Sequence, residues 1–225
     1  MARLEAPQLV TDSRMLYYTW VPADPSAVRA LVPGELEMAP NNQCFINQYV
    51  VDSTDQTSGF EAYSLTYCGA DLSGHDTPDG NVPGRWWTHY FNSNADMRAY
   101  AAERGVPAGS GETTLDIADG VLTATTSVDG KPLIRTKARV GDPAVWGAGQ
   151  LRYVTDVKGT LTSGLYPFNA HLVDPFEVLS VEFLQSDHPV YALRPADPLE
   201  VTWGFYSPKA SFCYPGGEGP LSSMP

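Results

Sequence analysis

The segment ETTLDIADGVLTATTSVDGKPLIRTKARV, residues 112–140, contains the strongest hairpin signal in this sequence. It contains two Asp-Gly pairs, at 119–120 and 129–130, which divide it into three segments of strand length. An Asp-Gly pair between two such segments is typical of a two-residue β-hairpin, because both turn residues adopt positive φ. Residues 112–140 are therefore predicted to form a three-stranded antiparallel meander.

Aromatic and β-branched runs of strand length lie on both sides of this meander. Such residues favour strands because they pack well on a pleated, half-buried surface. The predicted strands lie within 15–22, 43–51, 61–68 and 85–93 before the meander, and within 151–164, 176–192 and 199–214 after it.

Two short helices interrupt the predicted strands. The first, within 23–37, is capped by Asp24 and stopped by Pro33-Gly34. The second, within 92–105, is capped by Ser93 or Asn94. The chain contains no repeat and no linker. We therefore expect a single mainly β (α+β) domain over residues 1–225, with an antiparallel sheet and a few short helices.

Composition argues against two classes of partner. The formal net charge is −12, with only 14 Lys and Arg among 225 residues. A nucleic-acid-binding domain normally has a basic face, and an anionic membrane surface attracts basic segments. We therefore expect neither nucleic acid nor membrane as a partner.

The first residues, MARLEAPQLV, lack the apolar core of a signal peptide, and no later segment has the length of a membrane span, which predicts a cytoplasmic protein.

The common catalytic and metal-binding motifs are missing from the sequence. There is no GxSxG, P-loop, GxGxxG or HExxH pattern. Cys44, Cys68 and Cys213 are far apart and odd in number, which excludes a disulfide scaffold and a cysteine-rich zinc site and predicts buried thiols. The loop 71–79 combines His75 with three aspartates; it could hold a hard cation, but a solvated acidic loop is favoured. We expect no metal and no cofactor.

Two polar side chains stand in apolar strands. His89 lies within RWWTHYFN, where alternation places it on one face with Trp87 and Phe91. A histidine between two aromatic residues is either a hydrogen-bonded core residue or a group that moves protons or binds substrate in a cavity. Arg14 opens an apolar strand, so its guanidinium either extends to solvent or pairs with a carboxylate of the protein or of a ligand.

The order of these elements resembles that of the acetoacetate decarboxylase superfamily. The resemblance extends over residues 11–215, and its implied fold is an antiparallel β-barrel or cone with a few short helices. In that superfamily a lysine forms a Schiff base with the substrate ketone, and an adjacent lysine and an apolar pocket lower its pKa. Members commonly form homo-oligomers. The matching segments are SRMLYYTWVPADPSAVRALVPGELEM (13–38), FINQY (45–49), TSGFEAYSLTY (57–67), WWTHYFNSNADMRAYAAERGVPAG (86–109) and the meander.

The lysine pair of the superfamily is missing from this chain. In the family it follows an aromatic-Pro dipeptide after the second helix, and the matching positions here are Ala108 and Gly109. No lysine occurs before residue 131. A Schiff base would therefore need Lys131 or Lys137 to reach the cavity.

Other family positions are partly retained. The family's active-site glutamate falls at Leu65, with Glu61 four residues earlier on the same face, and another family carboxylate falls near Ile46. The family arginine that orients the acid group of the substrate matches Arg14. The resemblance thus implies His89 and Arg14 as catalytic residues, and Gln48, Tyr63, Trp87, Glu61 and Leu65 as substrate-binding residues.

Three functions fit this set of residues. The first is a small-molecule enzyme of specialised metabolism that moves a proton on an enolisable keto acid or polyketide-like substrate by cyclisation, dehydration, isomerisation or decarboxylation. In this reading His89 transfers the proton and Arg14 holds a carboxylate or enolate. The second is a non-catalytic small-molecule binding protein. The third is a decarboxylase or aldolase with a relocated lysine.

Overall fold

The predicted meander is present and continues into two very long strands. The computed structural model describes residues 4–221. Asp119 and Asp129 have φ of 50°, and Gly120 and Gly130 follow with φ of 72° and 71°, as tight hairpin turns require. The strands are β6 (Glu112–Ala118), β7 (Val121–Val128) and β8 (Lys131–Val157), and β8 turns back into β9 (Thr160–Phe183).

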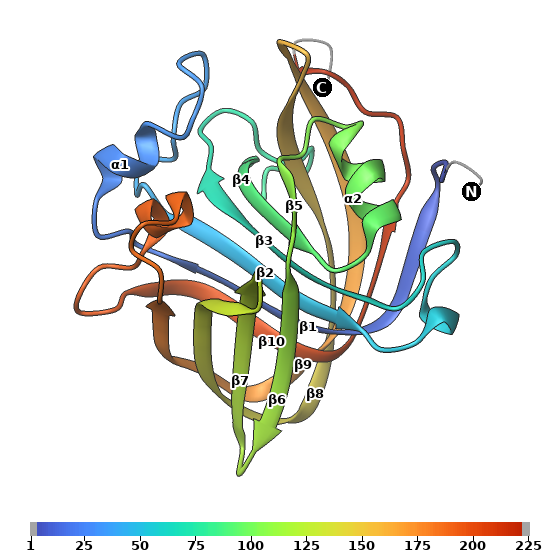
Figure 1. The fold of residues 1–225 in the computed structure, drawn as a ribbon, viewed down its shortest axis with the longest axis vertical. Coiled ribbons are helices and arrows are strands. Elements are labelled where there is room, and N and C mark those ends of the chain that lie inside the picture. The colour runs from blue at the N-terminus through green and yellow to red at the C-terminus, as the bar shows by residue number, and fades with distance from the viewer. Residues whose placement is uncertain (1–3, 222–225) are drawn as a thin grey trace.

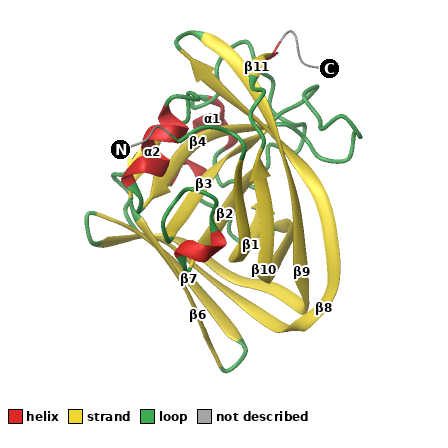
Figure 2. Cartoon of the chain, turned by 90° about the vertical axis from the view of Figure 1, so that its right-hand side faces the viewer, coloured by secondary structure: helices red, strands yellow, loops and turns green. Residues whose placement is uncertain are grey.

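Seven strands close into a barrel (Figures 1 and 2), which confirms the expected mainly β fold. Six of the seven pairings are antiparallel. The seventh is a parallel contact of β4 with β8, so the expectation of a wholly antiparallel sheet is wrong at this point. In ring order the strands are β1 (Gln8–Trp20), β2 (Cys44–Val51), β3 (Tyr63–Asp71), β4 (Arg85–Asn92), β8, β9 and β10 (Val201–Tyr214).

The β8–β9 hairpin belongs to two layers at once. Its register runs from Ile134 opposite Phe183 to Val157 opposite Thr160. Residues 131–139 of β8 also pair with β7, whereas Tyr153 and Val154 pair with β4. One end of the hairpin therefore extends the meander and the other end closes the barrel, as the long curved strands in Figure 2 show.

Alternation along the barrel strands separates two hydrophobic cores. The interior core fills the barrel and contains residues from all seven strands, among them Tyr17, Tyr67, Trp87, Tyr166 and Phe205. The outer core packs the opposite face of β1–β4 against the meander and the first half of β8. It includes Tyr18, Ile46, Cys68, Leu122 and Ile134.

Short elements complete the chain. The predicted helices are α1 (Pro25–Arg29), capped by Asp24, and α2 (Ala95–Ala102), capped by Asn94. The buried face of α2, with Met97 and Tyr100, belongs to the interior core and covers one end of the barrel (Figure 1). The remaining elements are η1 (Thr54–Gln56), η2 (Pro189–Leu193), β5 (Ala108–Ser110), which pairs in parallel with β4, and β11 (Gly219–Pro220).

Within residues 4–221, neither helix is long and apolar enough to cross a membrane. The three cysteines are free, as expected, with Cys44 and Cys68 buried and Cys213 half-buried. Burial raises the pKa of both buried thiols, which keeps them protonated and unreactive.

A β-bulge in β4 decides which core each side chain enters. The register against β3 shifts between Cys68, which pairs with His89, and Gly69, which pairs with Trp87. The extra residue, Thr88, places His89 on the outer side and Trp87 in the interior core. The expectation that Trp87 and His89 share a face is therefore wrong, because simple alternation does not hold across a bulge.

We expect Gly69→Ala to disrupt this bulge. An added Cβ at Gly69 would lie 1.9 Å from the Trp86 carbonyl oxygen, so the backbone would have to move. The free energy of unfolding should fall by about 3 kcal/mol or more, measured by urea denaturation. Gly109→Ala is the control, because the nearest atoms to its added Cβ lie at 3.7 Å; its effect should stay within about 1 kcal/mol. Equal effects of the two substitutions would contradict the role of Gly69.

Candidate functional site

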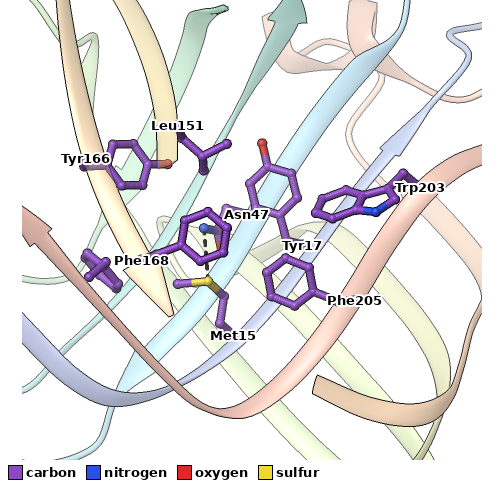
Figure 3. Close-up of a pocket in the computed structure, with 9 residues that line it drawn as sticks. Met15, Tyr17, Asn47, Leu151, Tyr166, Phe168, Trp203 and Phe205 are labelled. Atoms are coloured by element: carbon purple, nitrogen blue, oxygen red, sulfur yellow. Dashed lines mark hydrogen bonds between the residues drawn. The ribbon is translucent and has the colours of Figure 1, made fainter. Parts of the chain in front are cut away.

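An aromatic pocket lies inside the barrel at the end where β4 begins. It leaves about 20 Å³ of free space, roughly the room of one water molecule. Most of its lining is aromatic and its surface is apolar (Figure 3). This inner pocket is lined by Met15, Tyr17, Asn47, Leu151, Tyr166, Phe168, Trp203, Phe205 and Phe212.

A wider recess of about 410 Å³ adjoins the inner pocket. Leu151, Phe168 and Trp203 line both spaces and so form the boundary between them. In contrast to the inner pocket, this outer recess carries polar and charged side chains. Its other lining residues are Thr19, Gln43, Asp79, Asn81, Val82, Pro83, Arg85, Ala148, Gly149 and Gln150.

Arg85 is a buried cation at this end of the barrel. It is the first residue of β4 and only 3% exposed. Its Nε donates a hydrogen bond of 3.1 Å to Asp71, the last residue of β3, and its Cζ lies 4.9 Å from the centre of the Tyr17 ring. Its Nη1 is buried and has no hydrogen-bond partner. One arm of the guanidinium therefore has an unused hydrogen-bond donor.

A polar chain holds Asp71 in place. Gln43 donates a hydrogen bond from Nε2 to Asp71 and accepts one from Thr202 at 2.8 Å. Burial raises the pKa of Asp71 above its ordinary value, although Arg85 and Gln43 act in the opposite direction. Burial also acts to lower the pKa of Arg85, but its interactions with Tyr17 and Asp71 outweigh this, so that the pKa is raised and the cation persists.

A second unpartnered donor lies beside Arg85. The Tyr17 hydroxyl is buried without a hydrogen-bond partner. Burial holds its pKa well above the ordinary value, although the charge of Arg85 acts to lower it, so Tyr17 is a neutral phenol that can donate a proton or hydrogen bond. Other polar groups nearby are partly paired: Asn47 donates from Nδ2 to the Tyr67 hydroxyl at 2.9 Å, and Tyr67 shares a hydrogen bond with Tyr166. The Asn47 Oδ1, in contrast, is buried without a hydrogen-bond partner.

The sequence-predicted binding residues are divided between the two cores. Tyr63, Leu65 and Trp87 lie in the interior core but line neither the inner pocket nor the outer recess. Gln48 is buried on the outer side, where it donates to Thr126 at 2.9 Å and accepts from Thr136 at 3.2 Å. Glu61 is exposed. The structure therefore does not gather these five residues at one cavity.

Arg14 forms an ion pair near the surface. Its Nε and Nη2 donate to the two carboxylate oxygens of Asp52 at 2.8 and 2.6 Å, and its Nη1 donates to the Leu115 carbonyl. Its side chain is 32% exposed. The sequence left open whether the Arg14 guanidinium extends to solvent or pairs with a carboxylate, and in the structure it pairs with a carboxylate of the protein. Arg14 lines neither the inner pocket nor the outer recess.

His89 lies on the outer side of β4, away from Arg85 and Tyr17. Its Nδ1 is 2.9 Å from the Thr88 hydroxyl, and its ring contacts those of Phe91 and His188. Burial, followed by the charge of His188, lowers the pKa of His89 to about 4. His89 is therefore neutral at pH 7 and is not brought together with Arg14.

The two positions at which the sequence resemblance places a lysine pair, Ala108 and Gly109, carry no amine. Ala108 packs against the interior core, and Gly109 pairs with Phe91. All four lysines, Lys131, Lys137, Lys158 and Lys209, are exposed, and none lines the inner pocket or the outer recess. In the described part of the chain, no group of three or more His, Cys, Asp or Glu residues is arranged to hold a metal ion.

Sequence reasoning missed Arg85 and Asp71. A usable signal was present, because opposite charges stand at the end of one aromatic strand and at the start of the next. In an antiparallel hairpin those positions are neighbours, and the structure pairs Asp71 directly with Arg85.

We expect Asp71→Asn to destabilise the fold strongly, because it leaves the buried Arg85 without a counter-charge. The free energy of unfolding should fall by about 3–5 kcal/mol in urea denaturation. Asp52→Asn is the matched control: it removes the partner of the half-exposed Arg14 and should cost less than about 1 kcal/mol. A larger loss from Asp52→Asn than from Asp71→Asn would contradict the assignment.

His89 should make the fold sensitive to acid. Because its pKa falls from 6.5 to about 4 on folding, the unfolded chain binds a proton in this range that the folded chain does not. Stability should therefore decrease as pH falls from about 6.5 to 4 and show no further loss from this residue below that pH. His89→Gln should remove a pH-dependent loss on the order of 3 kcal/mol, measured by denaturation at pH 7 and pH 4. His171→Gln is the control, and an unchanged slope in His89→Gln would refute the prediction.

Comparison with known proteins bears on the fold. No protein-family model and no curated protein matches the sequence. Among solved structures, an acetoacetate decarboxylase superimposes with a TM-score of 0.64 at 16% identity, covering 96% of this chain and 90% of that one. An acetoacetate decarboxylase-like enzyme from Sphingomonas wittichii RW1 gives 0.61 at 18% identity, with 96% and 93% covered. The enduracididine biosynthesis enzyme MppR, complexed with pyruvate, gives 0.64 at 13% identity, with 97% and 91% covered. This chain therefore has the acetoacetate decarboxylase-like fold.

Proposed function

We propose that this protein is a small-molecule enzyme that acts on an enolisable keto acid or polyketide-like substrate without a Schiff base. The reacting group would lie where the inner pocket meets the outer recess. One observation carries the proposal: Arg85 Nη1 and the Tyr17 hydroxyl are two buried donors without partners, and they belong to side chains in contact. Unsatisfied buried donors are rare in folded proteins and are costly unless a ligand uses them.

These donors suit a reaction in which negative charge develops on an oxygen. In the decarboxylation of a β-keto acid, the bond to the carboxylate breaks, carbon dioxide leaves, and the electron pair moves onto the ketone oxygen. Arg85 and Tyr17 would stabilise the enolate that results, and a proton from water at carbon would complete the ketone. Tautomerisation or cyclisation through the same enolate would use the donors in the same way.

The arrangement of amines disfavours imine chemistry. A Schiff-base lysine needs a desolvated amine beside the substrate, because desolvation lowers its pKa. Every lysine of this chain is exposed, so the relocated-lysine alternative lacks structural support. The proposed chemistry therefore depends on a fixed cation and a phenol.

A non-catalytic binding protein is the second candidate. It is favoured by the absence of a strong base: among the described residues that line the two spaces, none is His, Lys or Cys, and Asp79 is the single carboxylate. A reaction that needs proton abstraction by a protein base would therefore have only Asp79 as a candidate base among these lining residues. Ligand binding without turnover would use the same two donors.

The substitution Tyr17→Phe distinguishes an effect on the reaction rate from an effect on fold stability. Its hydroxyl makes no hydrogen bond, so the substitution should leave the free energy of unfolding unchanged or slightly raised. If Tyr17 donates to the developing enolate, carbon dioxide release from a β-keto acid should slow by about 100-fold or more.

Tyr63→Phe is the matched control for this experiment. It removes a hydroxyl bonded to Tyr49 at 2.9 Å in the interior core, outside both spaces. It should cost about 1 kcal/mol of stability and leave the rate nearly unchanged. Unchanged turnover in Tyr17→Phe would refute the enzymatic role, and binding without turnover by the wild-type protein would support the second candidate.

A further inference from the structure

The inner pocket is built from flat rings in a nearly parallel arrangement. The Phe205 ring lies at 12° to both neighbouring rings, with centres 5.9 Å from Tyr17 and 6.5 Å from Phe168. The Trp203 ring meets Tyr17 and Phe205 edge-on, at 5.8 and 5.4 Å. These surfaces would match a planar group, which can offer one face to a parallel ring and an edge to another.

Phe168 is the lining side chain that a planar group entering from the outer recess would meet, together with Leu151 and Trp203. It is half-buried and lines both the inner pocket, where Figure 3 labels it, and the outer recess. Its ring lies over the backbone of Gly149 on the neighbouring strand, where an added Cβ would come within 3.1 Å of it. Because only about 20 Å³ is free beside it, a ligand ring can enter only if the Phe168 ring moves.

Trp203 stands at the mouth of the same space. It is 52% exposed, which is unusual for the largest apolar side chain, and it lines both the inner pocket and the outer recess. A ring bound in the inner pocket would cover part of this exposed surface. Trp203 would therefore gain apolar contact when the pocket is filled.

Resting on the function proposed above, we propose that the substrate carries an aromatic ring that displaces the ring of Phe168, enters the inner pocket and is covered by Trp203. Its ketone oxygen would then lie toward Tyr17 and Arg85. The acid group, at the other end of the substrate, would face the outer recess. The substrate class is thus an aryl keto acid in preference to a short aliphatic one.

Two β-keto acids that differ only in the acyl substituent test this inference. Benzoylacetate and acetoacetate present the same ketone and carboxylate, but only the first carries a ring. In calorimetric titration of the full chain, the Kd for benzoylacetate should be at least tenfold lower than that for acetoacetate. Phe168→Ala should retain this preference, because the ligand ring fills the vacated space.

Two exposed tryptophans provide matched variants. Trp203→Ala should raise the Kd for benzoylacetate at least tenfold and leave that for acetoacetate within twofold. Trp146→Ala removes a tryptophan that is 57% exposed and outside both spaces, and it should change neither value.

The outcomes distinguish this inference from the function on which it rests. Equal affinity for the two acids, or loss of the preference in Phe168→Ala, would overturn the aromatic substrate class. If both acids are still decarboxylated in a Tyr17-dependent manner, the proposed function stands alone. Failure of both acids to bind would overturn the inference and the proposed function together.

Discussion

The pairing of β8 with β9 connects the barrel to the meander. A single antiparallel register holds two layers, because one end of the hairpin extends the meander and the other closes the barrel onto β4 and β10. The side-chain period of a strand is two residues, so a slip of one residue would exchange the interior and outer faces along both strands. Burial of apolar side chains in both the interior core and the outer core therefore favours the same pairing register of β8 with β9.

Closure of the barrel removes its interior from water, so burying a charged side chain there carries a desolvation penalty. Arg85 and Asp71 lie there as a paired cation and anion, and such a pair seldom stabilises a fold as well as apolar residues would. The pair is also incomplete, since one guanidinium arm has no partner. The unpartnered donor belongs to a side chain that lines the outer recess, next to the inner pocket.

The chain has the acetoacetate decarboxylase-like fold, and all four of its lysines are exposed. Ala108 and Gly109 lie on β5, which pairs with the last residues of β4, and Ala108 packs against the interior core. Arg85, which lines the outer recess, lies at the other end of β4, where that strand begins. A shared fold does not by itself imply shared chemistry, because function depends on the site and not on the fold.

Local structure could be predicted from the sequence: the Asp-Gly turns, the aromatic strands, and the caps at Asp24 and Asn94. These features depend on neighbouring residues, so a single sequence reveals them. The face that each side chain occupies, and the partner of Arg14, became known from the three-dimensional structure. Trp87 and His89 enter different cores because of a bulge opposite Gly69, and Arg14 and Arg85 are distinguished by their partners on adjacent strands, Asp52 and Asp71. Register and burial arise from pairing between distant segments, and local sequence patterns do not encode them.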